Sequence, residues 1–276
     1  MKFPIQFRSD EIVHEVAEME SKISAGIATL TSMKDDDVDI GSTPKDVFYA
    51  RETFQVYHYK PLVDKDKIHP VPMLVSTPLI NGYEVADLQP DRSLVRNFLK
   101  EGIDVYMINW GYPKRCDRYN NIDDYVTDYI DDIADKVIEN SGADKINLFG
   151  ICMGGTLATC YSALWPEKVR NLVLTVTPID FDQYKVEGQP HVGLLFAMGK
   201  SANVDAMVDA FGNVPADVLN VSFLMASPFT LMFGKYVGNK QDYKELPIKT
   251  GHIGIYTGGA SQKILAPAAA KWLKEH

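Results

Sequence analysis

The sequence predicts an α/β fold with a mostly parallel central sheet and helices on both of its faces. Short apolar segments of strand length alternate with longer segments whose apolar residues recur at helical spacing. Such alternation is typical of parallel strands joined by crossover helices, which bury both faces of a sheet. A sharp glycine-rich turn between one strand and the next helix supports the same class. Because 276 residues suffice for one large domain, we expect a single domain over 1–276.

In the first half of the chain, the periodicity predicts helices and strands in turn. Residues 9–31 predict a helix, because a capping serine precedes apolar residues at helical spacing. The acidic stretch 35–41 is interpreted as a solvated linker. Thr43 followed by Pro44 predicts the start of a short helix, and the alternation over 54–59 predicts a strand. The other elements expected in this half are the buried strands 71–77 and 103–109 and the helix 93–100.

The second half continues the alternation and then changes character. Its first expected elements are the amphipathic helix 122–141, the strand 145–149, the helix 154–164 and the strand 170–177. Residues 179–240 hold many Met, Phe, Gly and Pro residues without clear periodicity, and we expect this insertion to form a lid or cap. A strand over 243–248 and an amphipathic helix over 261–274 are expected to complete the domain.

The most informative segment is the turn Gly150-Ile151-Cys152-Met153-Gly154-Gly155, between an expected strand and an expected helix. It matches the nucleophile elbow G-x-S-x-G, with cysteine in place of serine. In such a turn the nucleophile stands at the top of the sheet, and side chains at the flanking glycines would collide with neighbouring elements. The strand, elbow and helix order predicts the α/β-hydrolase fold. A cysteine at this position favours thioester chemistry over ordinary ester hydrolysis.

The candidate catalytic groups are taken from this architecture. Cys152 alone would suit a small buried hydrophobe equally well, but the surrounding strand, helix and downstream histidine favour a nucleophile. His252 follows the last expected strand in a glycine-flanked loop, where the general base belongs, and is expected to activate the Cys152 thiol. The backbone N–H groups of Met153 and Ile80 are the expected oxyanion donors. The remaining histidines and cysteines are interpreted as structural or surface residues: His14, His58, His69, His191, His276, Cys116 and Cys160.

Composition restricts the function classes. The formal net charge of −9 and the isoelectric point near 5.2 argue against nucleic-acid binding. Three cysteines without paired spacing indicate a reducing compartment. The first residues are too charged for a signal peptide and no apolar run has the length of a membrane span, so a cytoplasmic protein is expected. No residues have the spacing of a zinc site, and no metal is expected.

Seven short blocks, distributed over nearly the whole chain, carry a further signal. They are 78–81 (PLIN), 87–95 (DLQPDRSLV), 105–111 (VYMINWG), 123–125 (DDY), 150–156 (GICMGGT), 211–215 (FGNVP) and 251–254 (GHIG). With these blocks the chain resembles the polyhydroxyalkanoate synthases, especially the short catalytic subunits of the two-component types. The cysteine elbow followed by threonine is the most specific of the blocks.

The resemblance implies polymerisation of (R)-3-hydroxyacyl-coenzyme A, such as 3-hydroxybutyryl-coenzyme A, with release of coenzyme A. It implies that Cys152 attacks the thioester, that His252 activates the thiol, and that an incoming hydroxyl group extends the polyester from the acyl-cysteine. Coenzyme A is then part of the substrate and product, and no cofactor is expected. The resemblance further implies a second, non-catalytic synthase subunit, a homodimer, and a location at the surface of polyester granules.

The sequence departs from the family at the catalytic acid, which would form a triad with Cys152 and His252. The family places a catalytic aspartate after the penultimate strand, but here 239–243 leads from the lid straight to the last expected strand, so we interpret the lid as truncated near 239–240. Asp242 is too close to His252 in sequence to replace that acid, which stays unknown. Either the full protein has residues that this chain lacks, which the agreement of all other features favours, or the protein is genuinely shortened. A cysteine-dependent hydrolase or thioesterase, and a non-catalytic degenerate synthase on granules, stay open as alternatives.

Overall fold

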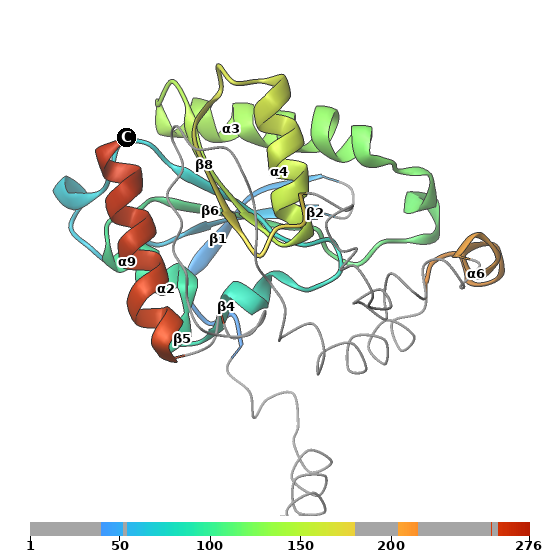
Figure 1. Ribbon diagram of the computed structural model, residues 1–276, viewed down its shortest axis with the longest axis horizontal. Helices are drawn as coiled ribbons and strands as arrows, with labels where there is room; N and C mark the ends of the chain where they lie inside the picture. Colours follow the sequence, from blue (N-terminus) through green and yellow to red (C-terminus); the bar gives the residue numbers. More distant parts are fainter. Residues whose placement is uncertain (1–39, 52–53, 180–203, 215–254, 256–258) are drawn as a thin grey trace, which may run out of the picture. The chain divides into compact units, whose positions relative to one another are not determined.

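Within the described residues, the main sheet of the computed structural model (Figure 1) has six strands. Their order is β1-β2-β6-β3-β7-β8. The structure describes residues 40–51, 54–179, 204–214, 255 and 259–276, all within one unit that comprises Ile40–His276. The strands are β1 (Lys45–Arg51), β2 (Phe54–Tyr59), β3 (Met73–Ser76), β6 (Val105–Asn109), β7 (Ile146–Ile151) and β8 (Val169–Thr175). Strands β6, β3, β7 and β8 run parallel, whereas β1 and β2 join antiparallel, which confirms a mostly parallel sheet.

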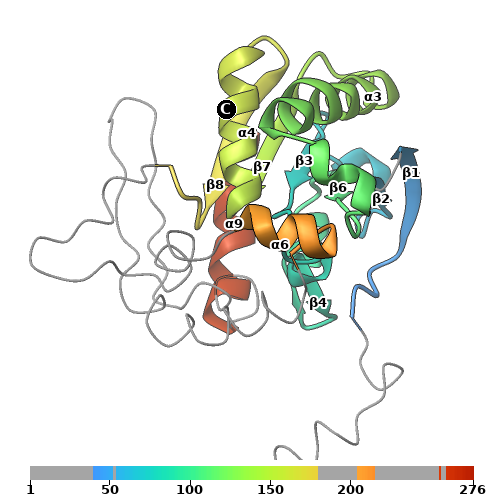
Figure 2. The same ribbon diagram turned by 90° about the vertical axis from the view of Figure 1, so that its right-hand side faces the viewer.

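Helices cover both faces of this sheet, as expected (Figures 1 and 2). On one face, α2 (Leu94–Lys100) and α9 (Gly259–Glu275) pack on apolar side chains of β3, β6 and β7. On the other face lie α4 (Met153–Leu164) and a π-helix (Asp124–Ile130) that continues into α3 (Asp131–Ser141). Each large apolar side chain buried in these two cores stabilises the fold by about 1.5–3 kcal/mol.

The other described elements are short. They are the 3₁₀ turns η2 (Lys65–Lys67), η3 (Tyr83–Ala86) and η4 (Arg115–Tyr119), the strands β4 (Asp87–Gln89) and β5 (Arg92–Ser93), and the helix α6 (Val204–Phe211). The expected strands and helices between 54 and 177 are confirmed with small changes at their ends. The expected helix over 93–100 begins after Ser93, whose hydroxyl accepts a hydrogen bond from the backbone N–H of Arg96 at 2.9 Å. The expected helix over 261–274 lies within α9.

The short helix expected from Thr43 and Pro44 is wrong, because this segment leads into strand β1. The Thr43 hydroxyl donates to the carboxylate of Asp87 at 2.5 Å and caps no helix. The Pro44 carbonyl accepts from the backbone N–H of Lys60 at 2.9 Å, which starts the pairing of β1 with β2. Tertiary pairing has overridden the local capping signal, and the following Val47 and Phe48 favour a strand as well.

The hairpin of β4 and β5 is organised around one buried carboxylate. Asp87 accepts hydrogen bonds from the backbone N–H of Thr43 at 3.2 Å, from the Thr43 hydroxyl, and from the Ser93 hydroxyl at 2.6 Å. The Gly41 N–H donates to the Asp87 carbonyl at 2.8 Å. The block at 87–95 therefore joins the hairpin, the start of α2 and the segment that enters β1.

Several expectations fall outside the described residues. These are the helix 9–31, most of the acidic stretch 35–41 and of the insertion 179–240, and the strand 243–248. The single-domain assignment and the lid therefore stay predictions. Within the insertion, α6 is described, and its Asp209 forms an ion pair with Arg118 at 2.8 Å.

Candidate active site

Cys152 stands at the turn between β7 and α4 with a strained backbone. Its φ of 52° and ψ of −124° lie outside the regions that non-glycine residues ordinarily occupy. The Cys152 N–H donates to the carbonyl of Thr175 on β8 at 2.9 Å, and its own carbonyl accepts from the Gly155 N–H at 2.9 Å. These bonds hold the residue from the neighbouring strand and from the following helix. Strain kept by such contacts is common at catalytic positions.

The glycines of the turn are needed for close backbone contacts. A Cβ atom on Gly154 would lie 2.2 Å from the Ser76 carbonyl oxygen and 2.4 Å from that of Thr77, at the end of β3. A Cβ atom on Gly150 would lie 2.3 Å from the Cα atom of Gly155. Both distances are far below van der Waals contact, so the expected collisions with the neighbouring strand and helix are confirmed. The first turn of α4 consequently rests directly on the carboxyl end of β3.

The surroundings of the Cys152 thiol act on its pKa in two directions. Burial raises the pKa, and a hydrogen bond from the backbone of Met153 lowers it by a smaller amount, so the net shift is upward. The helix dipole of α4 favours negative charge at this end. A half-buried thiol with a raised pKa stays protonated at neutral pH, and its use as a nucleophile requires a base.

The two expected oxyanion donors stand on neighbouring elements. Met153 is the first residue of α4, and its backbone lowers the pKa of the adjacent Cys152 thiol. Ile80 lies in the loop between β3 and η3, and 42% of its surface is exposed. That loop starts at Thr77, beside Gly154, so it begins next to the elbow. Whether the N–H of Ile80 completes an oxyanion hole stays a prediction.

His252 and Asp242 lie outside the described residues, so the base and third acid of the site stay predictions. Among the other histidines, His58 is described in a structural role. Its Nε2 is 2.7 Å from the carboxylate of Asp104, and its ring stacks on Tyr106 with centroids 4.0 Å apart. Asp104 directly precedes β6, so this pair lies at the amino ends of the parallel strands, whereas the elbow lies at their carboxyl ends. Cys116 and Cys160 are exposed residues and do not belong to the elbow turn.

A second strained residue at the elbow escaped sequence reasoning. Val176, directly after β8, has a φ of 46°, which is a true outlier for a β-branched residue. The next residue, Thr177, places its side chain where a Cβ atom on Gly155 would lie, 1.9 Å from the threonine hydroxyl oxygen. The end of β8 thus supports the elbow from its other side. A valine at the end of an apolar strand carries no sequence signal for such a conformation.

Within the residues that the structure covers, no group of three or more His, Cys, Asp or Glu side chains has the arrangement of a metal site. Nor does any helix of the described ranges have the length and apolarity that crossing a membrane requires.

Two family models match the chain. The model described as alpha/beta hydrolase fold matches residues 82–219, and it agrees with the observed sheet order and elbow. The model described as Poly-beta-hydroxybutyrate polymerase (PhaC) N-terminus matches residues 9–98. The two matches overlap and together cover most of the chain.

Curated relatives share sequence over most of this chain. The poly(3-hydroxyalkanoate) polymerase subunit PhaC of Allochromatium vinosum is 39% identical, and the alignment covers 99% of both chains. That alignment has 362 positions against the 276 residues of this chain, so the relative carries internal residues without a counterpart here. The PhaC subunit of a Synechocystis strain is 38% identical over 86% of this chain, and that of Thiocystis violacea is 37% identical over 89%. The matched regions span 62% and 66% of those two relatives' own lengths.

Solved structures with a similar backbone include a crystal structure described as a putative lipase from Sulfolobus solfataricus. It is 16% identical, with a TM-score of 0.48, and the match covers 84% of this chain and 98% of that one.

Proposed function

Because this chain belongs to the family of poly(3-hydroxyalkanoate) polymerase subunits, we propose that it is an acyltransferase that polymerises (R)-3-hydroxyacyl-coenzyme A. The expected substrate is a short-chain thioester such as 3-hydroxybutyryl-coenzyme A, and the product is a polyester. The relatives are named as polymerase subunits, which supports the polymerase activity. The substrate and the acyl-cysteine mechanism are our inference from the elbow and from the family.

The proposed reaction has two chemical steps. In the first, the Cys152 sulfur attacks the thioester carbonyl, the C–S bond to coenzyme A breaks, and His252 takes the thiol proton and passes it to the departing coenzyme A sulfur. In the second, the hydroxyl group of another hydroxyacyl unit attacks the acyl-cysteine, an ester bond forms, the C–S bond to Cys152 breaks, and the hydroxyl proton returns through the base to the Cys152 sulfur. Exchange between two thioesters is nearly isoenergetic, so the acyl-cysteine remains reactive enough to acylate an alcohol.

The strained backbone of Cys152 at the start of α4 is the single observation that carries the proposal. It supports a nucleophile held at the carboxyl end of a parallel strand, directly before Met153 at the N-terminus of α4. An ordinary buried cysteine would need no left-handed backbone, which costs about 1–3 kcal/mol. The raised pKa of the thiol supports a role for a base, and His252 is our candidate.

The environment of the reaction is part of the same proposal. Water must be kept from the acyl-cysteine, or the enzyme becomes a thioesterase, and we assign this to the apolar insertion 179–240. No cofactor takes part, since coenzyme A enters and leaves with the substrate. A non-catalytic synthase subunit and a second copy of this chain are the proposed partners. The proposed location is the surface of polyester granules in the cytoplasm.

Intact-protein mass spectrometry after mixing with (R)-3-hydroxybutyryl-coenzyme A tests the nucleophile. We expect additions of whole hydroxybutyryl units, lost in Cys152→Ala. Cys160→Ala is the matched control, because this cysteine lies on the same helix with an exposed thiol, and its loss should leave the additions intact.

The released products separate the proposal from its alternatives. Coenzyme A release with a growing ester chain supports the synthase. Coenzyme A release with only free hydroxy acid would indicate a thioesterase. No acylation in the presence of the partner subunit would indicate a non-catalytic protein.

A further inference from the structure

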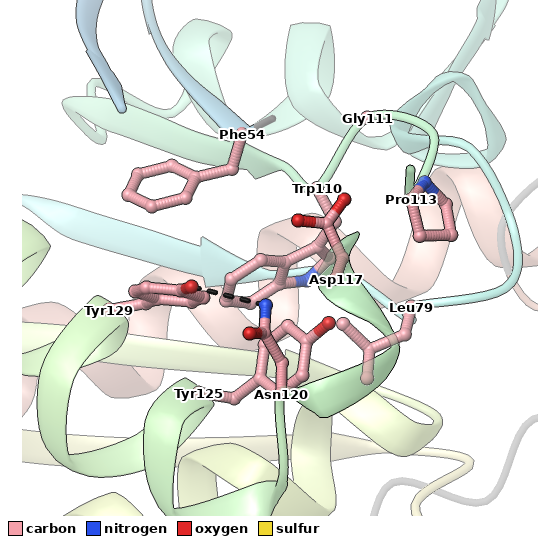
Figure 3. A pocket seen from close by; sticks show the side chains of 9 residues that line it. All are labelled: Phe54, Leu79, Trp110, Gly111, Pro113, Asp117, Asn120, Tyr125 and Tyr129. Carbon is pink, nitrogen blue, oxygen red and sulfur yellow. Dashed lines mark hydrogen bonds between the residues drawn. The ribbon is translucent and has the colours of Figure 1, made fainter. Parts of the chain in front are cut away.

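The described part of the chain has a small pocket that the proposed chemistry does not use. Its volume is about 80 Å³, and neither Cys152 nor Met153 lines it. Trp110 and Gly111 in its wall directly follow β6, and Leu79 lies in the loop after β3. Figure 3 shows the complete lining, which consists of Phe54, Leu79, Trp110, Gly111, Pro113, Asp117, Asn120, Tyr125 and Tyr129.

Four aromatic rings form the wall of this pocket. Phe54 packs against Trp110 and Tyr129, and Tyr125 packs against the same two rings, with centroids 5.2–6.1 Å apart. The side-chain amide of Asn120 donates to the Tyr129 hydroxyl at 3.1 Å and also hydrogen-bonds Tyr125. Phe54, Trp110 and Tyr129 are almost fully buried. The rings are therefore fixed by one another and by a shared polar contact, so the pocket is preformed.

The charge that lines the pocket is negative, and no lining residue is positively charged. Asp117 is the one ionisable carboxylate among the lining residues, and none of them is Lys or Arg. Its oxygens accept from the Lys114 N–H at 2.5 Å and from the Cys116 thiol at 3.7 Å, which leaves lone pairs on both. Aromatic faces attract cations, and this cluster already binds one, since the Arg51 guanidinium lies 5.1 Å from the centre of the Tyr129 ring.

The size of the pocket limits what enters it. An engineered cavity of roughly 150 Å³ holds benzene, so a pocket of about 80 Å³ holds a group of only a few heavy atoms. Adenine and the pantetheine arm of coenzyme A are too large. The end of one side chain fits, and the chemistry of the lining selects an ammonium or guanidinium group.

Exposed aromatic residues adjoin the lining residues of the pocket in sequence or lie on α6, which contacts the same loop. Tyr112 stands between two lining residues with 92% of its surface exposed, and Tyr119 precedes Asn120 with 78% exposed. Phe211 on α6 is 69% exposed, and α6 is held to the same loop by the Arg118–Asp209 ion pair and by a bond from Asn213 to the Pro113 carbonyl at 3.0 Å. That ion pair also neutralises a basic group at the rim. A preformed pocket with exposed aromatic residues next to its lining is a common setting of an interface hot spot.

We propose that this pocket is a docking site for a second polypeptide, which inserts a lysine or arginine side chain between the four rings and beside Asp117. The surrounding Tyr112, Tyr119 and Phe211 would contact the apolar neighbours of that residue. The inference stands on the pocket alone and does not rest on the proposed acyl transfer.

Side-chain mimics test the charge selectivity on the full chain. The probes are the N-acetyl methylamides of arginine, lysine, citrulline and norleucine, and tetramethylammonium. Binding is read from the indole ¹H–¹⁵N signal of Trp110, which Trp110→Phe assigns among the three tryptophans. We expect saturable millimolar binding of the arginine and lysine mimics, weakened at least about tenfold in Asp117→Asn because a charge-assisted bond is lost. Asp91→Asn, at an exposed carboxylate elsewhere, should change nothing.

Three results would overturn the assignment. Equal binding of the neutral mimics would show a site for apolar groups. Tighter binding of tetramethylammonium than of either side-chain mimic would show a site for a free quaternary ammonium. No saturable shift with any cation would show no site at all.

The rim is tested separately with the peptide N-acetyl-Leu-Arg-Leu-amide. If a polypeptide docks here, the flanking leucines should strengthen binding about tenfold over the single-residue mimic, and Tyr119→Ser should remove most of that gain. A peptide that binds no better than the mimic would contradict the docking of a polypeptide. Tyr119 is exposed, so the variant is expected to fold normally.

Discussion

The indole N–H of Trp110 donates a hydrogen bond to the carbonyl oxygen of Thr77 at 2.9 Å, and both residues are buried. The Thr77 hydroxyl in turn donates to the carbonyl of Ile108 at 2.7 Å. The same Thr77 carbonyl lies under Gly154 at the start of α4. The peptide group that begins the loop toward Ile80 is thus held from β6, from the indole and from the elbow helix.

Trp110→Phe removes this donor and keeps an aromatic ring. The Thr77 carbonyl would lose a buried hydrogen bond, which is expected to lower the free energy of unfolding by about 1–3 kcal/mol in urea denaturation. If the loop carries an oxyanion donor, the rate of Cys152 acylation should fall about tenfold to a hundredfold. KM should stay nearly unchanged, because that donor stabilises the transition state and contributes little to substrate binding.

Trp165→Phe is the matched control, because that indole stacks on Tyr161 with centroids 5.0 Å apart and has no part in the loop. It should leave the acylation rate unchanged. An unchanged rate in Trp110→Phe, alongside the expected loss of stability, would mean that the bond serves the core alone.

Gly154→Ala should damage the elbow by steric collision. The added methyl group would lie 2.2 Å from the Ser76 carbonyl oxygen, a backbone atom that cannot move aside alone. We expect a loss of about 3 kcal/mol or more in the free energy of unfolding. Gly142→Ala provides the contrast, because Gly142 has a φ of 70° but nothing within 4 Å of its missing Cβ atom.

The contrast separates collision from backbone strain. Gly142→Ala should lose only about 1–2 kcal/mol, the usual effect of placing a side chain in the left-handed region. Similar losses in the two variants would show that the contact of α4 with β3 is looser than the structure has it. Circular dichroism and urea denaturation of both variants measure the difference.

The elbow could be predicted because its signal is local. One short segment contains the strand, Cys152, the helix and the glycines that allow their close approach. The pattern is therefore defined by residues that are adjacent in sequence. The parallel sheet and its covering helices followed from periodicity for the same reason. Strand β1 could not be predicted, because what fixes it is its pairing with β2 and the bond of Thr43 to Asp87, 44 residues away.

The aromatic pocket and the Trp110–Thr77 bond are non-local in the same sense. Tyr125 and Tyr129 are spaced four residues apart within the expected amphipathic helix 122–141, but nothing local joins them to Phe54 and Trp110. The positive φ of Val176 likewise results from packing at the end of β8. Contacts of this kind are visible only once the sheet has placed distant segments together.

The buried carboxylate of Asp87 gives a stability prediction. Asp87→Ala would leave the Thr43 N–H, the Thr43 hydroxyl and the Ser93 hydroxyl without their acceptor, so we expect a loss of about 2–4 kcal/mol. Asp91→Ala, in the same hairpin but exposed, should change the free energy of unfolding by less than about 0.5 kcal/mol. Urea denaturation of both variants checks this, and equal effects would mean that the hairpin is not organised by Asp87.

The reactivity of Cys152 with pH tests whether a base acts on it. A Cys116→Ser/Cys160→Ser variant leaves Cys152 as the sole cysteine, and its alkylation by iodoacetamide follows the thiolate fraction. Burial raises the pKa of this thiol above its ordinary value of 9.0, so from its immediate surroundings the alkylation rate should still be rising as the pH passes 9. If His252 forms an ion pair with the thiolate, as our mechanism allows, the midpoint should instead lie near or below neutral pH, and His252→Gln should move it back to alkaline pH.

A midpoint above 9 that does not respond to His252→Gln would exclude thiolate formation in the resting enzyme. His252 would then act only as a general base during the attack on the thioester, where its loss would lower the acylation rate and leave the alkylation profile unchanged.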